Sequence, residues 1–191
     1  MTTKSRHQKN KPRADKLPAL RTAIANHPFF RGLSAAHLDA LAGCALQTQF
    51  PSNAMICRQG NIANRFYLIE DGCVALEADQ PGHGTIPIQT LGAGDALGWS
   101  WLFPPHVWRF SARTVKPARV IFFKDTRLRA HFAANPGLGH ELVKRIAQMV
   151  VERLQATQIQ LVQISKVAMR AQIQALQLTM PKGHSLPGAK N

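Results

Sequence analysis

The sequence predicts an α+β fold, mainly β, in which a jelly roll or antiparallel barrel is flanked by helices. Between Leu46 and Lys124, short apolar runs alternate with turn signals, which is typical of many short antiparallel strands. On both sides of this region apolar residues recur at helical spacing, most clearly in a run without glycine or proline from Leu138 to about Thr179. The chain has 191 residues and is 45% hydrophobic, which is enough for one core domain and an extension.

Helical signals precede the strands, from Leu17 to Gly43. Pro18 suits the first turn of a helix, because its missing N–H has no partner there in any case. Ser34 is expected to cap the next helix, and Gly43 lies near the expected end of that helix.

The strand-rich region contains several short apolar segments separated by turn residues. The pair Asp71-Gly72 lies between two apolar runs and predicts a β-hairpin. Asp125 is then expected to cap a short helix that ends near Asn135-Pro136. The predicted strands are Met55–Cys57, Arg65–Ile69, Val74–Leu76, Ile86–Leu91, Phe110–Val115 and Arg119–Phe123.

The long final helix carries a heptad stripe at alternating spacings of four and three, and we expect it to pair with the same helix of a second subunit. A helix of ~40 residues would extend ~60 Å, more than one small domain covers. The alternative is a lone amphipathic helix that lies on its own domain. The stripe, over residues 143–178, consists of Val143, Ala147, Val150, Leu154, Thr157, Leu161, Ile164, Ala168, Ala171, Ala175 and Leu178.

The formal net charge is +14, and much of the excess lies in residues 1–16. A block of like charge without apolar anchors predicts a disordered arm. The arm is either a solubilising tail or a contact with nucleic acid or an acidic membrane through charge alone. Its charged residues are Lys4, Arg6, Lys9, Lys11, Arg13 and Lys16, with Asp15 opposed to them.

Cysteine usage and hydropathy predict a cytoplasmic protein. The three cysteines, Cys44, Cys57 and Cys73, are isolated and form neither a disulfide framework nor a zinc motif, so we expect buried, reduced thiols. The N-terminus lacks the apolar region of a secretory signal. No apolar run approaches the ~18 residues of a membrane span.

The most specific motif is the run from Ile56 to Gly72, ICRQGNIANRFYLIEDG, in which two glycines bracket an apolar strand. It closely resembles the first signature of the cyclic-nucleotide-binding domain, the sensor of the Crp/Fnr superfamily. The flanking segments 27–34, 72–76 and 92–95 are similar to those of the family as well. The resemblance covers roughly Pro28 to Ile164, and it implies a double-stranded β-helix with a dimerisation helix after it.

The resemblance also implies a phosphate-binding cassette for a cyclic nucleotide, cAMP or cGMP. The family's cassette has Gly-Glu, with Glu on the ribose 2′-OH, and later an Arg before a small hydroxyl residue. Here Gly98 is kept and Trp99 stands at the Glu position. Arg109 lies at the distance of the phosphate Arg but precedes Phe110, and Arg113 is a second candidate. The implied ligand-binding residues are Gly98, Trp99, Ser100, Arg109, Phe110, Ser111, Arg113 and, on the long helix near the base, Thr157.

All three tryptophans of the chain lie in this cassette, together with Phe103 and Phe110, and two interpretations stay open. The aromatic side chains fill the old pocket, or they line a pocket for a different ligand with an acidic group held by Arg109 or Arg113. The eight histidines show no metal-ligand spacing, and no nucleophile elbow, P-loop or carboxylate pair is present, so we expect neither a metal site nor an enzyme.

The sequence thus predicts a cytoplasmic, non-enzymatic, homodimeric ligand sensor. The alternatives are a ligand-free dimeric interaction module and a regulator that associates weakly with nucleic acid through its arm. The expected organisation is a disordered arm (1–16), the β-roll with its N-terminal helices (17–136), a dimerisation helix (137–179) and a disordered tail (180–191). That tail is too short for the winged helix-turn-helix of the DNA-binding relatives.

Overall fold

The structure is a computed structural model that describes residues 16–80, 82 and 84–179, and the side chains of residues 175–179 are outside this description. The chain divides into two compact units, Met1–Val143 and Lys144–Asn191. Apart from Lys16, the expected basic arm lies outside the described residues, and so does the expected tail.

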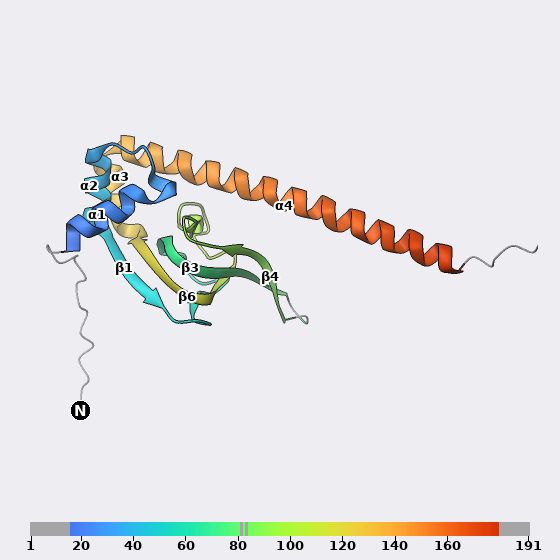
Figure 1. Cartoon of the computed structure of the whole chain (residues 1–191). Coiled ribbons are helices and arrows are strands. Elements are labelled where there is room, and N and C mark those ends of the chain that lie inside the picture. The colour runs from blue at the N-terminus through green and yellow to red at the C-terminus, as the bar shows by residue number, and fades with distance from the viewer. Residues whose placement is uncertain (1–15, 81, 83, 180–191) are drawn as a thin grey trace, which may run out of the picture. The chain divides into compact units, whose positions relative to one another are not determined.

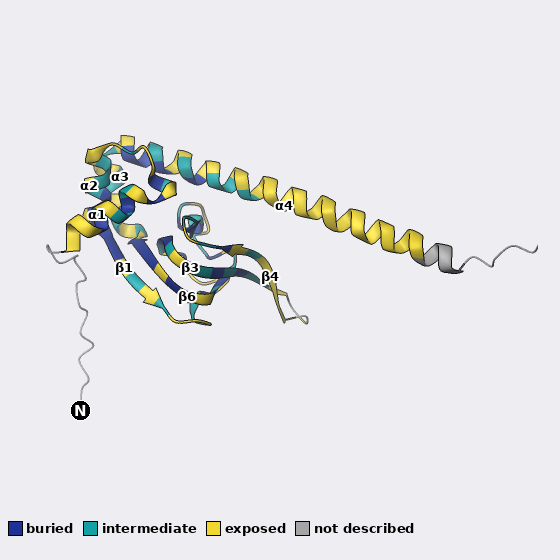
Figure 2. Cartoon of the chain, in the orientation of Figure 1, coloured by how far each residue is buried: buried dark blue, intermediate teal, exposed yellow. Residues whose placement is uncertain are grey.

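The first unit is built on one antiparallel sheet, which confirms the predicted mainly β jelly roll with flanking helices (Figure 1). The main path of the sheet runs β1-β6-β3-β4, with β2 paired to β6 and β5 paired to β3. Buried positions concentrate on the central strands β3 and β6 (Figure 2). The strands are β1 (Ala45–Phe50), β2 (Met55–Cys57), β3 (Arg65–Gln80), β4 (Gly84–Leu91), β5 (Ala96–Leu97) and β6 (Ser111–Lys124).

The predicted hairpin at Asp71-Gly72 is wrong, because β3 runs through this pair without a turn. The pairing with β6 shifts register on both sides of Asp71 and Cys73, so the pair lies in a bulge. A Cβ on Gly72 would lie 2.2 Å from the carbonyl oxygen of Pro117, and its φ is +99°. Residue 72 is therefore glycine because the β6 backbone approaches it too closely for a side chain. By the same continuity, the two strands predicted on either side of Pro117 are one strand, β6.

The helices match the predicted segments with small corrections at their ends. Ser34 caps α2, accepting a hydrogen bond from the His37 N–H at 3.3 Å. Gly43 lies within α2, one residue before its end, and Asp125 is the first residue of α3 after the cap residue Lys124. The helices are α1 (Leu17–Asn26), the 3₁₀ helix η2 (Pro28–Phe30), α2 (Ala35–Cys44), the 3₁₀ helix η3 (Trp99–Trp101), α3 (Asp125–Ala134) and α4 (Pro136–Thr179).

The long helix α4 begins two residues before the expected Leu138, because Asn135 provides its cap. The Asn135 Oδ1 accepts a hydrogen bond from the Leu138 N–H at 3.1 Å, and Pro136 occupies the first turn. Every described side chain of α4 from Leu154 to Gln174 is exposed in the single chain (Figure 2). No described helix combines the length and the hydropathy that a bilayer crossing requires.

A buried histidine joins the N-terminal helices to the sheet. His27 is 5% exposed; its Nδ1 accepts a hydrogen bond from the Phe29 N–H, and its Nε2 lies 3.2 Å from the Ile69 carbonyl oxygen. Because an amide only donates, Nδ1 has no proton, and the neutral ring donates from Nε2 to Ile69. Burial lowers the pKa of His27, opposed by the Ile69 hydrogen bond and the carboxylates of Glu70 and Asp95.

Substituting Gly72 by alanine should destabilise the protein far more than the same change at Gly60. Both glycines have a positive φ, but nothing lies within 4 Å of a Cβ on Gly60. We expect Gly60→Ala to cost about 1 kcal/mol of unfolding free energy, from backbone strain alone. We expect Gly72→Ala to cost about 3 kcal/mol, since the β6 backbone must also move. Urea unfolding of both variants measures the difference, and equal costs would contradict the close approach.

Stability should fall as the pH falls below the ordinary histidine pKa of 6.5, through His27. The folded-state pKa is lowered, so the unfolded chain binds more protons in acid and the free energy of unfolding rises with pH. The contribution is complete above pH 6.5 and is lost toward the lowered folded pKa. Between about pH 7.5 and pH 5, the urea midpoint of the wild type should fall by more than that of His27→Gln. Parallel curves would show that His27 is not the group.

Candidate ligand cassette

The cassette occupies residues 98–114, between β5 and the first residues of β6, and it begins at a glycine that no other residue replaces easily. Gly98 has φ +104° and ψ +36°, the left-handed region. A Cβ there would lie 2.7 Å from the Arg65 carbonyl oxygen and 3.0 Å from two ring carbons of Trp108. The chain turns at Gly98 into the single 3₁₀ turn η3 with the Trp108 ring against it.

Trp108 is 6% exposed, and backbone hydrogen bonds fix it to the turn before β3. Its N–H donates to the Asn61 carbonyl oxygen at 2.8 Å, and its carbonyl oxygen accepts from the Gly60 N–H at 2.9 Å. The ring lies 6.3 Å from that of Tyr67, centroid to centroid. The family signature and the cassette are therefore held together by main-chain bonds as well as by aromatic packing.

Trp101 is fully buried and belongs to the core of the first unit. Its ring packs on Phe132 of α3 at 5.9 Å, and the Arg129 guanidinium lies over it at 5.2 Å. Arg129 also donates a hydrogen bond to the Trp101 carbonyl oxygen. The indole N–H of Trp101 has no hydrogen-bond partner among the described residues, which is a cost that aromatic burial outweighs.

The outer part of the cassette is an exposed aromatic and proline loop. Trp99 is half-buried and meets Phe103 edge to face at 6.2 Å. The Pro104-Pro105 bond is cis, and His106 follows with φ +58°, closing the loop through its N–H on the Phe103 carbonyl oxygen.

The two predicted arginines lie in different surroundings. Arg113 is paired with Glu77 at 3.4 Å and donates to the backbone and side chain of Asn53. Arg109 is exposed, and its guanidinium donates to the Pro104 carbonyl oxygen at 3.5 Å. Arg109 thus keeps more of its hydrogen-bonding capacity for an anion than Arg113 does.

The remaining predicted residues are placed as follows. Ser111 is buried, and its hydroxyl accepts a hydrogen bond from the Gln59 N–H at 3.0 Å. Phe110 is half-buried beside it in sequence, and Ser100 is buried within η3. Thr157 is exposed on α4, in the second unit, with its hydroxyl donating to the Arg153 carbonyl oxygen at 2.9 Å.

The family is decided by the match of residues 47–135 to the model described as "Cyclic nucleotide-binding domain". This part of the chain is a cyclic nucleotide-binding domain. The match takes in the whole cassette and all six strands except the first two residues of β1. No curated protein shows significant sequence similarity to the chain.

Solved structures share the fold of this domain. A Geobacter metallireducens protein whose name assigns it provisionally to cyclic nucleotide binding is 28% identical, with a TM-score of 0.62 over 72% of this chain and 96% of that one. The Thermus thermophilus catabolite activator protein is 23% identical, with a TM-score of 0.58 over 72% of this chain and 63% of that one. The regulatory subunit of a cAMP-independent protein kinase A from Trypanosoma cruzi, bound to guanosine, is 19% identical, with a TM-score of 0.59 over 70% of this chain and 47% of that one.

The cassette of this cyclic nucleotide-binding domain carries cations but no carboxylate. Residues 98–114 contain Arg109 and Arg113 and neither Asp nor Glu. Among the described residues, no group of three or more His, Cys, Asp or Glu side chains is arranged to hold a metal ion. Residue 99, the position at which the sequence comparison expected the ribose-binding Glu, is a half-buried Trp.

Several residues that hold the cassette were not predicted from the sequence. Arg129 and Phe132 come from α3 and cover Trp101, and Glu77 comes from β3 and binds Arg113. None of these residues has a distinctive local pattern, and only the pairing of β3 with β6 and the packing of α3 bring them to the cassette. Gly98, in contrast, could be anticipated as a required glycine at the cassette's entry.

Replacing Trp101 by alanine should destabilise the domain much more than replacing Trp99. Trp101 is fully buried, so we expect a loss of about 3–5 kcal/mol of unfolding free energy. Trp99 is half-buried, and we expect about 1 kcal/mol for Trp99→Ala. Chemical denaturation measures both. Similar losses at the two positions would contradict the division of the cassette into a core part and an outer loop.

Proposed function

We propose that the chain is a dimeric, non-enzymatic regulatory module in which a cyclic nucleotide-binding domain has its cassette filled by its own aromatic side chains. In this proposal cAMP and cGMP are not held as in the family's usual site. The observation that carries it is the burial of Trp101 and Trp108, two of the three cassette tryptophans, with Trp101 packed on Phe132 and Arg129 and Trp108 packed near Tyr67.

The polar groups of the cassette support the same proposal. A cyclic nucleotide needs donors for its phosphate and an acceptor for its ribose hydroxyl. The Ser111 hydroxyl already binds the Gln59 N–H, and Arg113 already binds Glu77. Without a ribose carboxylate, the site lacks a charge-assisted hydrogen bond worth about 1.5–3 kcal/mol, which corresponds to roughly ten- to a hundredfold in affinity.

Dimerisation through α4 is the second part of the proposal. The heptad positions Leu154, Leu161 and Ile164 are apolar and between 56% and 66% exposed in the single chain. Apolar side chains at this spacing gain stability when a second helix covers them. Parallel pairing of α4 with itself covers the whole stripe in register.

A reducing, cytoplasmic location is also part of the proposal. All three cysteines are free, and burial raises the pKa of the Cys44 and Cys57 thiols to about 12. These two thiols are protonated and enclosed, so they act as apolar core groups.

A second candidate function is the sensing of a ligand other than a cyclic nucleotide. Arg109 is exposed, and the nearby Phe103 is 47% exposed with Trp99 half-buried against it. A cation beside exposed aromatic faces suits a flat, anionic ligand. The fold-sharing Trypanosoma cruzi protein, bound to guanosine, supports ligands beyond cyclic nucleotides for this fold.

Isothermal titration of the full chain with cAMP, cGMP and guanosine tests the proposal. We expect no saturable heat with any of the three, because the tryptophans are packed in the cassette and the polar groups of Ser111 and Arg113 already have hydrogen-bond partners. Saturable heat with cAMP or cGMP would overturn it. If heat is observed, Arg109→Ala identifies the source: binding that it weakens tenfold or more uses the outer loop. Lys116→Ala, which removes an exposed cation outside residues 98–114, serves as the control substitution.

A further inference from the structure

The distal part of α4 has apolar side chains on the side that two-stranded pairing leaves in solvent. With Leu154, Leu161 and Ala168 at the a positions, the d positions are Thr157, Ile164 and Ala171. In this frame four further apolar residues take the b and f positions, which face away from a paired helix. They are Ile159, Val162, Met169 and Ile173, and their exposed fractions run from 50% to 63%.

These four residues form a continuous stripe with Lys166 at its centre. The spacings along Ile159, Val162, Lys166, Met169 and Ile173 are three, four, three and four, so the five side chains follow one another on one helix face. At 100° per residue, this outer stripe lies about 150° around the helix from the a/d stripe. A partner on the a/d stripe therefore leaves the outer stripe uncovered.

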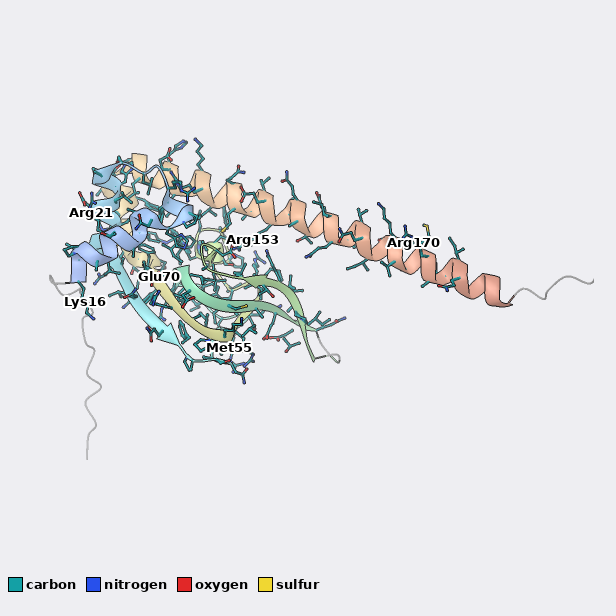
Figure 3. All side chains as sticks on the ribbon, viewed as in Figure 1. Lys16, Arg21, Met55, Glu70, Arg153 and Arg170 are labelled. Carbon is teal, nitrogen blue, oxygen red and sulfur yellow. The ribbon has the colours of Figure 1, made fainter. Side chains whose placement is uncertain are left out.

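The charges on this part of α4 are all of one sign. From Arg153 to Gln174 the helix has Arg153, Lys166 and Arg170 and neither Asp nor Glu. The e and g positions, where coiled coils usually place paired charges, hold uncharged residues from Gln158 to Gln174. Among the described residues no ion pair involves Lys166 or Arg170, and Arg170 extends from the helix in Figure 3.

We propose that the outer stripe (Ile159, Val162, Lys166, Met169 and Ile173) is the docking site for an acidic amphipathic helix of a partner protein. Apolar residues of that helix would cover Ile159, Val162, Met169 and Ile173, and its carboxylates would pair with Lys166 and Arg170. Such helix pairing uses both apolar anchors and complementary charge for selection.

Complementary charge selects this occupant over a second copy of the chain. Symmetric pairing of two outer stripes places Lys166 of one helix near Lys166 of the other, with no carboxylate from residue 153 onward to separate them. Like charges facing each other across a helix interface are unfavourable. An acidic partner removes this repulsion and adds attraction at the same position.

The test uses the full chain and two synthetic peptides of about four heptads each. Both have leucine at a and d; one has glutamate at e and g, and its matched control has lysine there. Fluorescence anisotropy measures binding of each labelled peptide to the full chain. We expect the acidic peptide to bind and the basic peptide to bind at least tenfold more weakly.

Variants then locate the binding. Val162→Gln/Met169→Gln should weaken binding of the acidic peptide tenfold or more, and Lys166→Glu should weaken it about fivefold or more. Gln163→Ala, at an exposed position outside both stripes, should leave it unchanged. Equal binding of the two peptides, or equal loss in Gln163→Ala, would overturn the proposal.

Light scattering on the same samples separates this proposal from the dimer. Two copies of the chain should be present with and without peptide, in the wild type and in the outer-stripe variants. A wild-type tetramer that Val162→Gln/Met169→Gln converts to a dimer would show that a second copy occupies the outer stripe and would overturn the acidic-helix proposal. A monomer that still binds the acidic peptide through the outer stripe would contradict the dimer and leave the docking site supported.

Discussion

The indole of Trp108 lies against the bare α-carbon of Gly98, and the arrangement of the cassette depends on this contact. A side chain at residue 98 would meet both the Trp108 ring and the backbone of Arg65. With glycine there, Trp108 stays inside the roll next to Tyr67, and its backbone binds the turn at Gly60 and Asn61. The turn of the family signature, the entry to the cassette and the start of β6 are thus one packed unit.

In our proposal, this constraint separates the fold of a cyclic nucleotide-binding domain from the ligand binding that is usual for the family. The sheet needs the glycine turn and buried residues on β3 and β6, and all of these are present. A nucleotide site needs in addition free donors and a carboxylate acceptor. In this chain Arg113 is paired with Glu77 and the Ser111 hydroxyl accepts from the Gln59 N–H, and residues 98–114 contain neither Asp nor Glu.

Most of the fold was predictable from the sequence, because local signals and tertiary packing agree there. The cap at Ser34, the apolar run of β3 and the long helix are examples. The prediction failed at Gly72, where a glycine that resembles a hairpin signal serves a close approach of Pro117. Sequence spacing suggested Arg109 as the phosphate arginine and Arg113 as a second candidate, and only the register of β3 against β6 shows that Arg113 lies beside Glu77. Such choices depend on strands that are distant in sequence, so no local pattern contains them.

Amide hydrogen exchange across residues 98–114, with and without cAMP in large excess, tests the central claim most directly. A cassette completed by its own side chains holds the amides of Trp108 and Leu102, both in backbone hydrogen bonds, without a ligand. The account predicts that these amides are protected in the free protein and that cAMP leaves their exchange unchanged. Rapid exchange in the free protein that slows markedly on addition of cAMP would contradict it, because the nucleotide would then be the group that completes the cassette.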